Sequence, residues 1–327
     1  MRVLVTGATG KVGNAVAHAL IERGDDVRAL VRDPNSAAAV LPDGVELLRG
    51  DVTDPASLDA ATADRELVFN SMGLPEQWFA DEGIFERVNA VGSESVVRAA
   101  ARAGVGRVVH TSTIDVFHAE QGARFDESRV ADYPKGTAYE RSKQRADELV
   151  LAASEEEGIE VVIANPAAVY GPGPEGGASP ERDVIEPVVN ARRAAAPALP
   201  PGGFGVVFTK GVASGHLLAA ERGKPGERYI LCDTHVTLRE LAQAAVRIAG
   251  RGRVPPTLPL PLAKAMAAAG EPIARLTGKP PLLPKGQLHF LLWNATPDSS
   301  KAQRELGWRP TPLDDGLRAT LVGAGLL

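Results

Sequence analysis

The sequence has little of what several classes of protein require. Its 327 residues contain one cysteine, Cys232, which excludes an internal disulfide framework and fits a reducing cytosol. The formal net charge is -5, so the chain has no basic excess with which to bind nucleic acid. The apolar segment LPLPLAKAMAAAG is too short, and too often interrupted by proline, to cross a bilayer. The amino terminus begins with strand-like residues and lacks the features of a signal peptide. We therefore expect a cytoplasmic protein with no nucleic-acid partner and no membrane insertion.

Side chains that commonly bind metals are also scarce. The chain has six histidines, and His110, His118 and His216 do not have the spacing of metal ligands. We expect these three to be strand or surface residues. Cys232 ends the apolar stretch RYILC, where a buried cysteine is expected. The sequence implies no metal site.

Short apolar runs alternate with helical patterns through the first half of the chain. VLVTG, DVRALV, GVELLRGD, ELVFNSMG, GRVVHTST and IEVVIANP are apolar on both faces, which is typical of strands covered by helices on either side. Helical patterns include those near residues 84–103 and 137–157. The repetition of strand and helix predicts an α/β fold with a doubly wound parallel (Rossmann) sheet.

The sequence pattern changes after Pro166, where proline and glycine become frequent and predicted strands and helices no longer alternate regularly. Helical patterns reappear at 211–222, 237–250 and 260–276. We predict a dinucleotide-binding domain over residues 1–165 and a smaller, mixed substrate-binding lobe over residues 166–327. Segments between about residues 205 and 235 are expected to return to the first domain.

A glycine-rich turn follows the first strand. VLVTGATGKVG places Gly7, Gly10 and Gly13 between that strand and the first helix. Glycines here allow a tight turn and a close approach of the backbone to a pyrophosphate, while the helix N-terminus supplies N–H groups. The spacing is G-x-x-G-x-x-G rather than G-x-G-x-x-G, but its place in a βαβ pattern supports a dinucleotide site. The candidate cofactor contacts in this turn are Gly7, Thr9, Gly10, Lys11, Val12 and Gly13.

The end of the second strand bears on the type of cofactor. An acidic residue there usually holds the ribose 2′-OH of NAD, whereas an arginine accommodates the 2′-phosphate of NADP. VRALVRDP has Arg32 at this tip and Asp33 directly after it. Arg32 offers a planar set of donors to a phosphate dianion. The sequence favours NADP(H), and Asp33 keeps NAD(H) open.

Tyr139 and Lys143 lie four residues apart in TAYERSKQRADEL. Any pair with this spacing shares a helix face, so the spacing alone does not separate a surface contact from a catalytic pair. The wider sequence does. TGATGKVG, GDVTD, RVNAVGSESVVRAA, VVHTSTIDVF, YERSK, NPAAVYGPG and the C-terminal SSKAQRELGWRPTPLDDGLRATL resemble the extended short-chain dehydrogenases/reductases nearly from end to end. The chain is most similar to dihydroflavonol reductase-like and 3β-hydroxysteroid dehydrogenase-like members.

The resemblance implies a catalytic triad. Tyr139 and Lys143 match the family's Y-x-x-x-K pair, and Thr113 matches its active-site hydroxyl, with Ser112 as a fallback. Tyr139 would exchange a proton with the substrate, Thr113 would orient the substrate oxygen, and Lys143 would hold the nicotinamide ribose. A phenol has a reference pKa near ~10, and the charge of Lys143 would favour the phenolate.

The resemblance also implies further cofactor contacts. Asp51 and Val52 match the segment that contacts adenine, and Asn89 matches an asparagine that is structural or part of a proton path. The remaining matches are Ser71, Met72 and Gly73, beside the cofactor ribose and diphosphate, and Asn165 and Pro166, which border the nicotinamide. A homodimer is the assembly that the family implies.

Several reactions share this fold and triad, so the fold does not select the activity. Dehydratases of the family have Thr-Asp-Glu where this chain has Thr113, Ile114 and Asp115, and isoleucine cannot protonate a leaving hydroxyl. We therefore expect an NADP(H)-dependent oxidoreductase that reduces a ketone or aldehyde, or catalyses the reverse reaction, on a small molecule.

Two alternatives stay open. One is a nucleotide-sugar epimerase with tightly bound NAD(P), for which Arg192 and Arg193 are candidates to grip a substrate diphosphate. The other is a non-catalytic NADP-sensing protein, which retention of the triad disfavours. The apolar segment PPLLPKGQLHFLLW could line a pocket for a hydrophobic carbonyl substrate or belong to the core.

Overall fold

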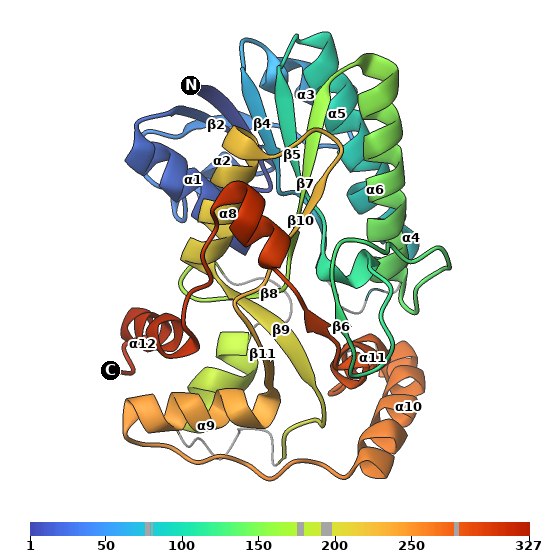
Figure 1. Ribbon diagram of the computed structural model, residues 1–327, viewed down its shortest axis with the longest axis vertical. Helices are drawn as coiled ribbons and strands as arrows, with labels where there is room; N and C mark the ends of the chain where they lie inside the picture. Colours follow the sequence, from blue (N-terminus) through green and yellow to red (C-terminus); the bar gives the residue numbers. More distant parts are fainter. Residues whose placement is uncertain (76–78, 80, 175–179, 191–197, 278–280) are drawn as a thin grey trace.

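The computed structural model describes residues 1–75, 79, 81–174, 180–190, 198–277 and 281–327. These residues form a main α/β part and a smaller part that faces the carboxyl ends of the main-sheet strands (Figure 1). No helix among them combines the length and the apolar character needed to span a bilayer.

The main sheet has seven parallel strands in the order β10-β7-β5-β4-β1-β2-β3. The strands are β1 (Arg2–Thr6), β2 (Asp26–Val31), β3 (Glu46–Arg49), β4 (Leu67–Asn70), β5 (Arg107–Thr111), β7 (Glu160–Pro166) and β10 (Arg228–Leu231). The strand order reverses between β1 and β4, which is the point where open α/β sheets bind ligands. The predicted doubly wound parallel sheet is confirmed.

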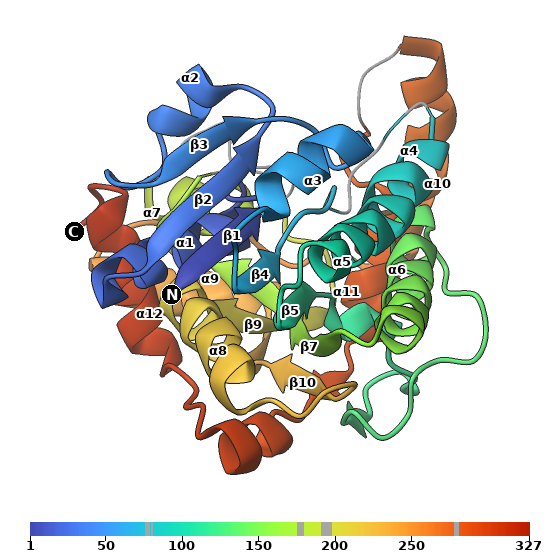
Figure 2. The same cartoon turned by 90° about the horizontal axis from the view of Figure 1, so that it is seen from above.

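Helices cover both faces of this sheet (Figure 2). On one face α1 (Lys11–Arg23) packs against α8 (Thr209–Arg222), and α2 (Pro34–Ala38) packs against β3. On the other face α5 (Gly92–Arg102) packs between α3 (Pro55–Thr62) and α6 (Ala138–Glu157). The strands carry apolar side chains on both faces of the sheet because each face is buried under a layer of helices.

The smaller part contains a mixed sheet in the order β11-β9-β8. β8 (Ala168–Tyr170) runs parallel to β9 (Gly203–Phe208), and β11 (Thr234–Thr237) runs antiparallel to it. Helices of this part include η3 (Glu181–Ile185), α7 (Glu186–Asn190), α9 (Leu238–Ala249), α10 (Leu260–Thr277), α11 (Lys285–Trp293) and α12 (Leu313–Gly323). The helical turn η4 (Ala302–Leu306) instead packs on α8 and β10 of the main part. The short strands β6 (Arg124–Phe125) and β12 (Thr296–Pro297) pair in parallel.

The chain passes between the two parts more than once. After β9 it forms α8, which packs on α1, and then β10, which is the edge strand of the main sheet next to β7. Cys232 follows β10 and is buried, as expected. The domain boundaries predicted from the sequence stay predictions.

The local sequence explains where α6, the helix that carries Tyr139 and Lys143, begins. Thr137 caps α6: its hydroxyl accepts the Glu140 N–H at 3.1 Å, and the Glu140 carboxylate accepts the Thr137 N–H at 2.8 Å. This reciprocal capping box satisfies two N–H groups of the helix start. The N-cap is therefore fixed two residues before Tyr139, and the helix begins at Ala138. A short helix α4 (Gly83–Phe85) and the helical turn η1 (Glu86–Val91) lead into α5, and the 3-10 turn η2 (Ile114–Val116) follows β5.

Candidate active site

The turn after β1 admits only glycine at two positions. Gly7 has φ +68°, and a Cβ there would lie 2.5 Å from the Ser71 carbonyl oxygen. A Cβ on Gly13 would lie 2.4 Å from the Gly7 carbonyl oxygen. The Gly10 N–H closes the turn on the Gly7 carbonyl at 2.9 Å, and no side chain of a described residue caps α1. The tight turn and the uncapped helix start fit a dinucleotide diphosphate.

Lys11 ties this turn to the smaller part of the molecule. Its Nζ lies 2.9 Å from Glu181 Oε2 and donates to the Gly171 carbonyl at 3.2 Å. Thr9 is exposed, and Val12 is half-buried against the main core. Lys11, a predicted cofactor contact, therefore forms an ion pair that links the two parts of the molecule. The sequence did not indicate this ion pair.

Two arginines lie at the ends of β2 and β3. Arg32 directly follows Val31, whose register partner on β3 is Arg49. Both arginines are exposed, and neither has a hydrogen bond or ion pair with another described residue. Asp33 instead caps α2, accepting the Asn35 N–H at 3.0 Å and the Ser36 hydroxyl at 2.5 Å. The Ser36 hydroxyl, the Asn35 N–H and the nearby Arg49 hold the pKa of Asp33 below its usual range.

The candidates for the adenine side occupy two neighbouring loops. Asp51 follows β3 and accepts the Thr53 N–H at 2.9 Å and its hydroxyl at 2.7 Å. Val52 and Met72 are buried in the same apolar cluster, which brings the loops after β3 and β4 together. Ser71 is half-buried and accepts the Thr111 hydroxyl at 3.0 Å.

Thr113 lies two residues after the end of β5, at the N-cap of η2, and is 6% exposed. Its hydroxyl donates to Asp115 Oδ2 at 2.8 Å, and its carbonyl accepts the Asn165 side-chain N–H at 2.9 Å. Asn165 Oδ1 is buried and has no hydrogen-bond partner among the residues that the structure describes. Asn165 and Pro166 end β7, the next strand, so Asn165 presents an unused acceptor beside Thr113.

Lys143 is buried, with 5% of its surface exposed. Its Nζ donates to the Thr111 carbonyl at 3.0 Å, and a Cβ on Gly73 would lie 3.2 Å from that nitrogen. Burial lowers the pKa of Lys143 to about 8. Tyr139 lies one turn earlier on α6, half-buried, with its ring edge-to-face with Phe85 at a centroid distance of 6.1 Å.

Asn89 joins the loop after β4 to α6. Its side chain exchanges hydrogen bonds with the backbone of Leu74 at 2.7 and 3.1 Å and donates to the Ser142 hydroxyl at 3.0 Å. The fully buried Asn89 therefore holds the Gly73 loop against the helix that carries Tyr139 and Lys143. The structure brings Thr113, Lys143, Gly73, Asn89 and Asn165 to the carboxyl ends of β4, β5 and β7.

The expectation for His216 was wrong. His216 lies in α8, not in a strand or on the surface, and none of its surface is exposed. Its Nδ1 lies 2.7 Å from the Val212 carbonyl, and its Nε2 lies 2.9 Å from the Thr111 hydroxyl. Burial lowers the pKa of His216 to about 4, so the ring is neutral near pH 7. The described residues contain no group of three side chains suited to holding a metal ion.

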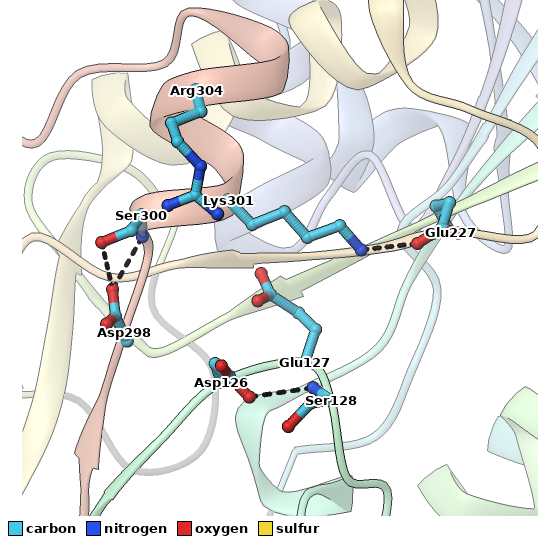
Figure 3. Close-up of a pocket in the computed structure, with 8 residues that line it drawn as sticks. All are labelled: Asp126, Glu127, Ser128, Glu227, Asp298, Ser300, Lys301 and Arg304. Atoms are coloured by element: carbon cyan, nitrogen blue, oxygen red, sulfur yellow. Dashed lines mark hydrogen bonds and ion pairs between the residues drawn. The ribbon is translucent and has the colours of Figure 1, made fainter.

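A cavity of about 340 Å³ lies elsewhere and contains none of the predicted site residues (Figure 3). It is lined by Asp126, Glu127, Ser128, Glu227, Asp298, Ser300, Lys301 and Arg304. Polar groups of its wall already have partners: Lys301 Nζ lies 2.5 Å from Glu227, and Glu127 accepts the N–H of Ile230 on the edge strand at 2.7 Å. We assign no ligand to it. Arg192 and Arg193 lie outside the described residues.

Together these features place the candidate dinucleotide site at the carboxyl ends of the strands of an α/β fold. Residues 3–232 match the model of the NAD dependent epimerase/dehydratase family. The chain belongs to this family, which confirms the resemblance to the extended short-chain dehydrogenases/reductases.

Three curated relatives match nearly the whole chain. Sterol demethylase protein B of Methylococcus capsulatus is 32% identical over 95% of this chain and 94% of its own. A putative dihydroflavonol 4-reductase of Synechocystis is 31% identical over 93% of this chain and 88% of its own. A 4-hydroxy-2-methyl-3-oxo-4-farnesyl-3,4-dihydroquinoline-1-oxide ketoreductase of Stigmatella aurantiaca is 30% identical over 94% and 92%. With reductases among its relatives, the protein is an NAD(P)-dependent oxidoreductase.

A solved structure, that of gox2253, has a TM-score of 0.81 and 30% sequence identity to this chain. The match covers 98% of this chain and 97% of that one. The likeness thus extends over both the main sheet and the smaller part.

Proposed function

We propose that the protein transfers hydride between NADP(H) and a ketone or aldehyde and its alcohol, with Thr113, Tyr139 and Lys143 as the catalytic residues. The burial of Lys143 is the observation that carries this proposal. A lysine of a surface pair would keep its charge in water, whereas this one is enclosed between the Thr111 carbonyl and the Gly73 loop. Burying a charge costs free energy, which argues for a functional role.

Each of the three residues has a distinct task in the reduction. The nicotinamide, when bound, supplies the hydride. Tyr139 would give its phenolic proton to the carbonyl oxygen, and the charge of Lys143 would stabilise the phenolate that remains. Thr113 would orient the same oxygen through its hydroxyl. Asn165 holds the Thr113 backbone in place, which supports that task.

The arrangement at the ends of β2 and β3 supports NADP(H) over NAD(H). Arg32 and Arg49 offer two guanidinium groups with no hydrogen bond or ion pair to another described residue, and a 2′-phosphate would give them such a partner. Asp33 uses both carboxylate oxygens to cap α2, so it is poorly placed to hold a ribose 2′-OH.

The side chains near Thr113 and the names of the relatives support carbonyl reduction. Ile114, 2% exposed, stands where an eliminating enzyme would need an acid. Two relatives are named as a ketoreductase and a putative dihydroflavonol reductase. Because relatives are also named for sterol and farnesyl-quinoline compounds, the substrate panel should begin with bulky apolar ketones.

The test is consumption of NADPH with a panel of ketones and aldehydes. Steady consumption with at least one carbonyl is the expected result. Tight cofactor binding without net consumption would contradict the reductase proposal. UDP- and GDP-sugars would then test the epimerase alternative.

A further inference from the structure

A row of polar side chains crosses the main sheet next to α6. Thr6 on β1, Asn70 on β4 and His110 on β5 are register partners in turn. The Thr6 hydroxyl donates to Asn70 Oδ1 at 2.7 Å, and Asn70 Nδ2 lies 3.2 Å from His110 Nδ1. None of the three side chains is exposed. Most polar groups buried in this way have a hydrogen-bond partner, and His110 Nε2 at the end of the row has none among the described residues.

Asp147 of α6 contacts His110, the last residue of this row. Its Oδ1 lies 3.4 Å from His110 Nε2, and its Oδ2 accepts the Ser112 hydroxyl at 2.9 Å and pairs with Arg228 of β10. Because Asn70 donates to His110 Nδ1, the proton of the neutral ring lies on Nε2 and faces Asp147. Burial lowers the pKa of His110, so the ring is neutral. Burial alone would raise the pKa of Asp147, but Arg228 and His110 outweigh it and hold that pKa low.

The same helix face carries the two catalytic candidates. Tyr139, Lys143 and Asp147 follow one another at intervals of four residues, so they lie along one side of α6. Lys143 bonds the Thr111 carbonyl, while Asp147 contacts the side chains of His110 and Ser112. The helix therefore contacts three consecutive residues at the end of β5, and Thr113 is the next residue.

We propose that Asp147 is a positioning residue of the active site, which anchors α6 to the end of β5 and supplies a negative charge one turn from Lys143. The inference rests on the proposed role of Lys143 and adds a residue to it. Asp147 touches neither substrate nor cofactor in this proposal. It fixes the helix that carries Tyr139 and Lys143 in register with the end of β5, which Thr113 follows by two residues.

The negative charge of Asp147 acts to raise the pKa of Lys143. Burial lowers the pKa of Lys143, and the carboxylates of Asp147 and Asp115 oppose this effect. Arg228 lies on β10, two strands away from β5, so the Asp147–Arg228 pair presents its negative end to the lysine. The charged groups that act on Lys143 are Asp147 on α6 and Asp115 on η2, and the ammonium in turn acts on His110 of β5, which Arg228 of β10 also influences.

The sharpest test removes the buried pair as a unit. D147N alone would leave the largely buried Arg228 without a partner and could unfold the protein, whereas D147N/R228M removes both charges together. The pKa of Lys143 is read by NMR from protein with [ε-13C]lysine, in which K143M identifies the resonance. We expect the acid dissociation constant of Lys143 to rise about 3-fold or more in D147N/R228M, because the carboxylate one turn from the lysine is lost and the loss of Arg228 on β10 offsets only part of that effect. D147E, which keeps the charge, should restore most of the wild-type value.

A second variant tests the anchor separately from the charge. S112A removes one contact of Asp147 and leaves its charge and its pairing with Arg228. We expect kcat to fall about 3- to 10-fold, with NADPH affinity and the pKa of Lys143 unchanged. S154A is the matched control, since Ser154 bonds the Ile159 carbonyl at the far end of α6. The control should keep wild-type kcat.

Two results would overturn the inference. An unchanged Lys143 titration in folded D147N/R228M would remove the charge role, and equal kcat in S112A and S154A would remove the anchor role. The NMR titration needs no turnover, so it decides the charge role of Asp147 even if no carbonyl is reduced. Failure of the carbonyl panel would instead count against the proposed function.

Discussion

Replacement of Lys143 with methionine is expected to abolish activity and stabilise the fold. The ammonium is buried, and its pKa of about 8 compares with an ordinary value of 10.5. This difference corresponds to about 3 kcal/mol of unfavourable free energy when the folded protein holds the proton. Methionine avoids that cost but leaves the Thr111 carbonyl without its donor, which costs about 1 kcal/mol. At pH 7 the net gain should be about 2 kcal/mol.

The difference in stability between K143M and wild type should depend on pH. Below pH 8 both the folded and the unfolded wild type hold the proton on Lys143, so the folded state bears the full cost. Between pH 8 and 10.5 only the unfolded state holds it, and wild-type stability gains relative to K143M as pH rises. The advantage of K143M should therefore be greatest near pH 7 and disappear toward pH 10.5.

Urea unfolding of wild type and K143M at pH 7 and pH 9.5 measures this difference. K210M is the matched control, because Lys210 is exposed and should change stability little. K143M should unfold at a higher urea concentration than wild type at pH 7, by less at pH 9.5, and should show no turnover. Equal or lower stability of K143M at pH 7 would refute the account of a costly buried charge.

Two further predictions concern the proton donor and the cofactor phosphate. Y139F should lower turnover by at least about 10²-fold with similar NADPH affinity, measured by steady-state kinetics and fluorescence titration, while Y133F should behave as wild type. Near-wild-type turnover in Y139F would remove Tyr139 from its assigned role. R32A and R49A should each weaken NADPH about 10-fold or more and NADH little, since each loses a charge-assisted contact, whereas R129A should change neither. Equal losses for both cofactors would show that neither arginine contacts a 2′-phosphate.

The fold could be predicted because its signals are local. Apolar runs on both strand faces and the helical spacing between them identify a parallel sheet before any contact is known. The helices expected at 211–222, 237–250 and 260–276 correspond to α8, α9 and α10 within two residues at each end. The triad was predicted because Thr113, Tyr139 and Lys143 stand in motifs, although their roles remain proposals.

The features that the sequence did not reveal depend on contacts between distant segments. Arg49 approaches Arg32 only because β2 and β3 pair in a particular parallel register. His216 looked like an ordinary polar residue until α8 placed it against Thr111. Asp147 is one of several acidic residues in a helical pattern, and its burial depends on Arg228, 81 residues later in the chain.

The most direct test of the central claim is titration with NADPH and NADH, followed by the carbonyl panel observed at the nicotinamide absorbance. The account predicts tighter binding of NADPH and its steady oxidation with a ketone or aldehyde. Preference for NADH, or tight binding without oxidation on any carbonyl, would contradict it.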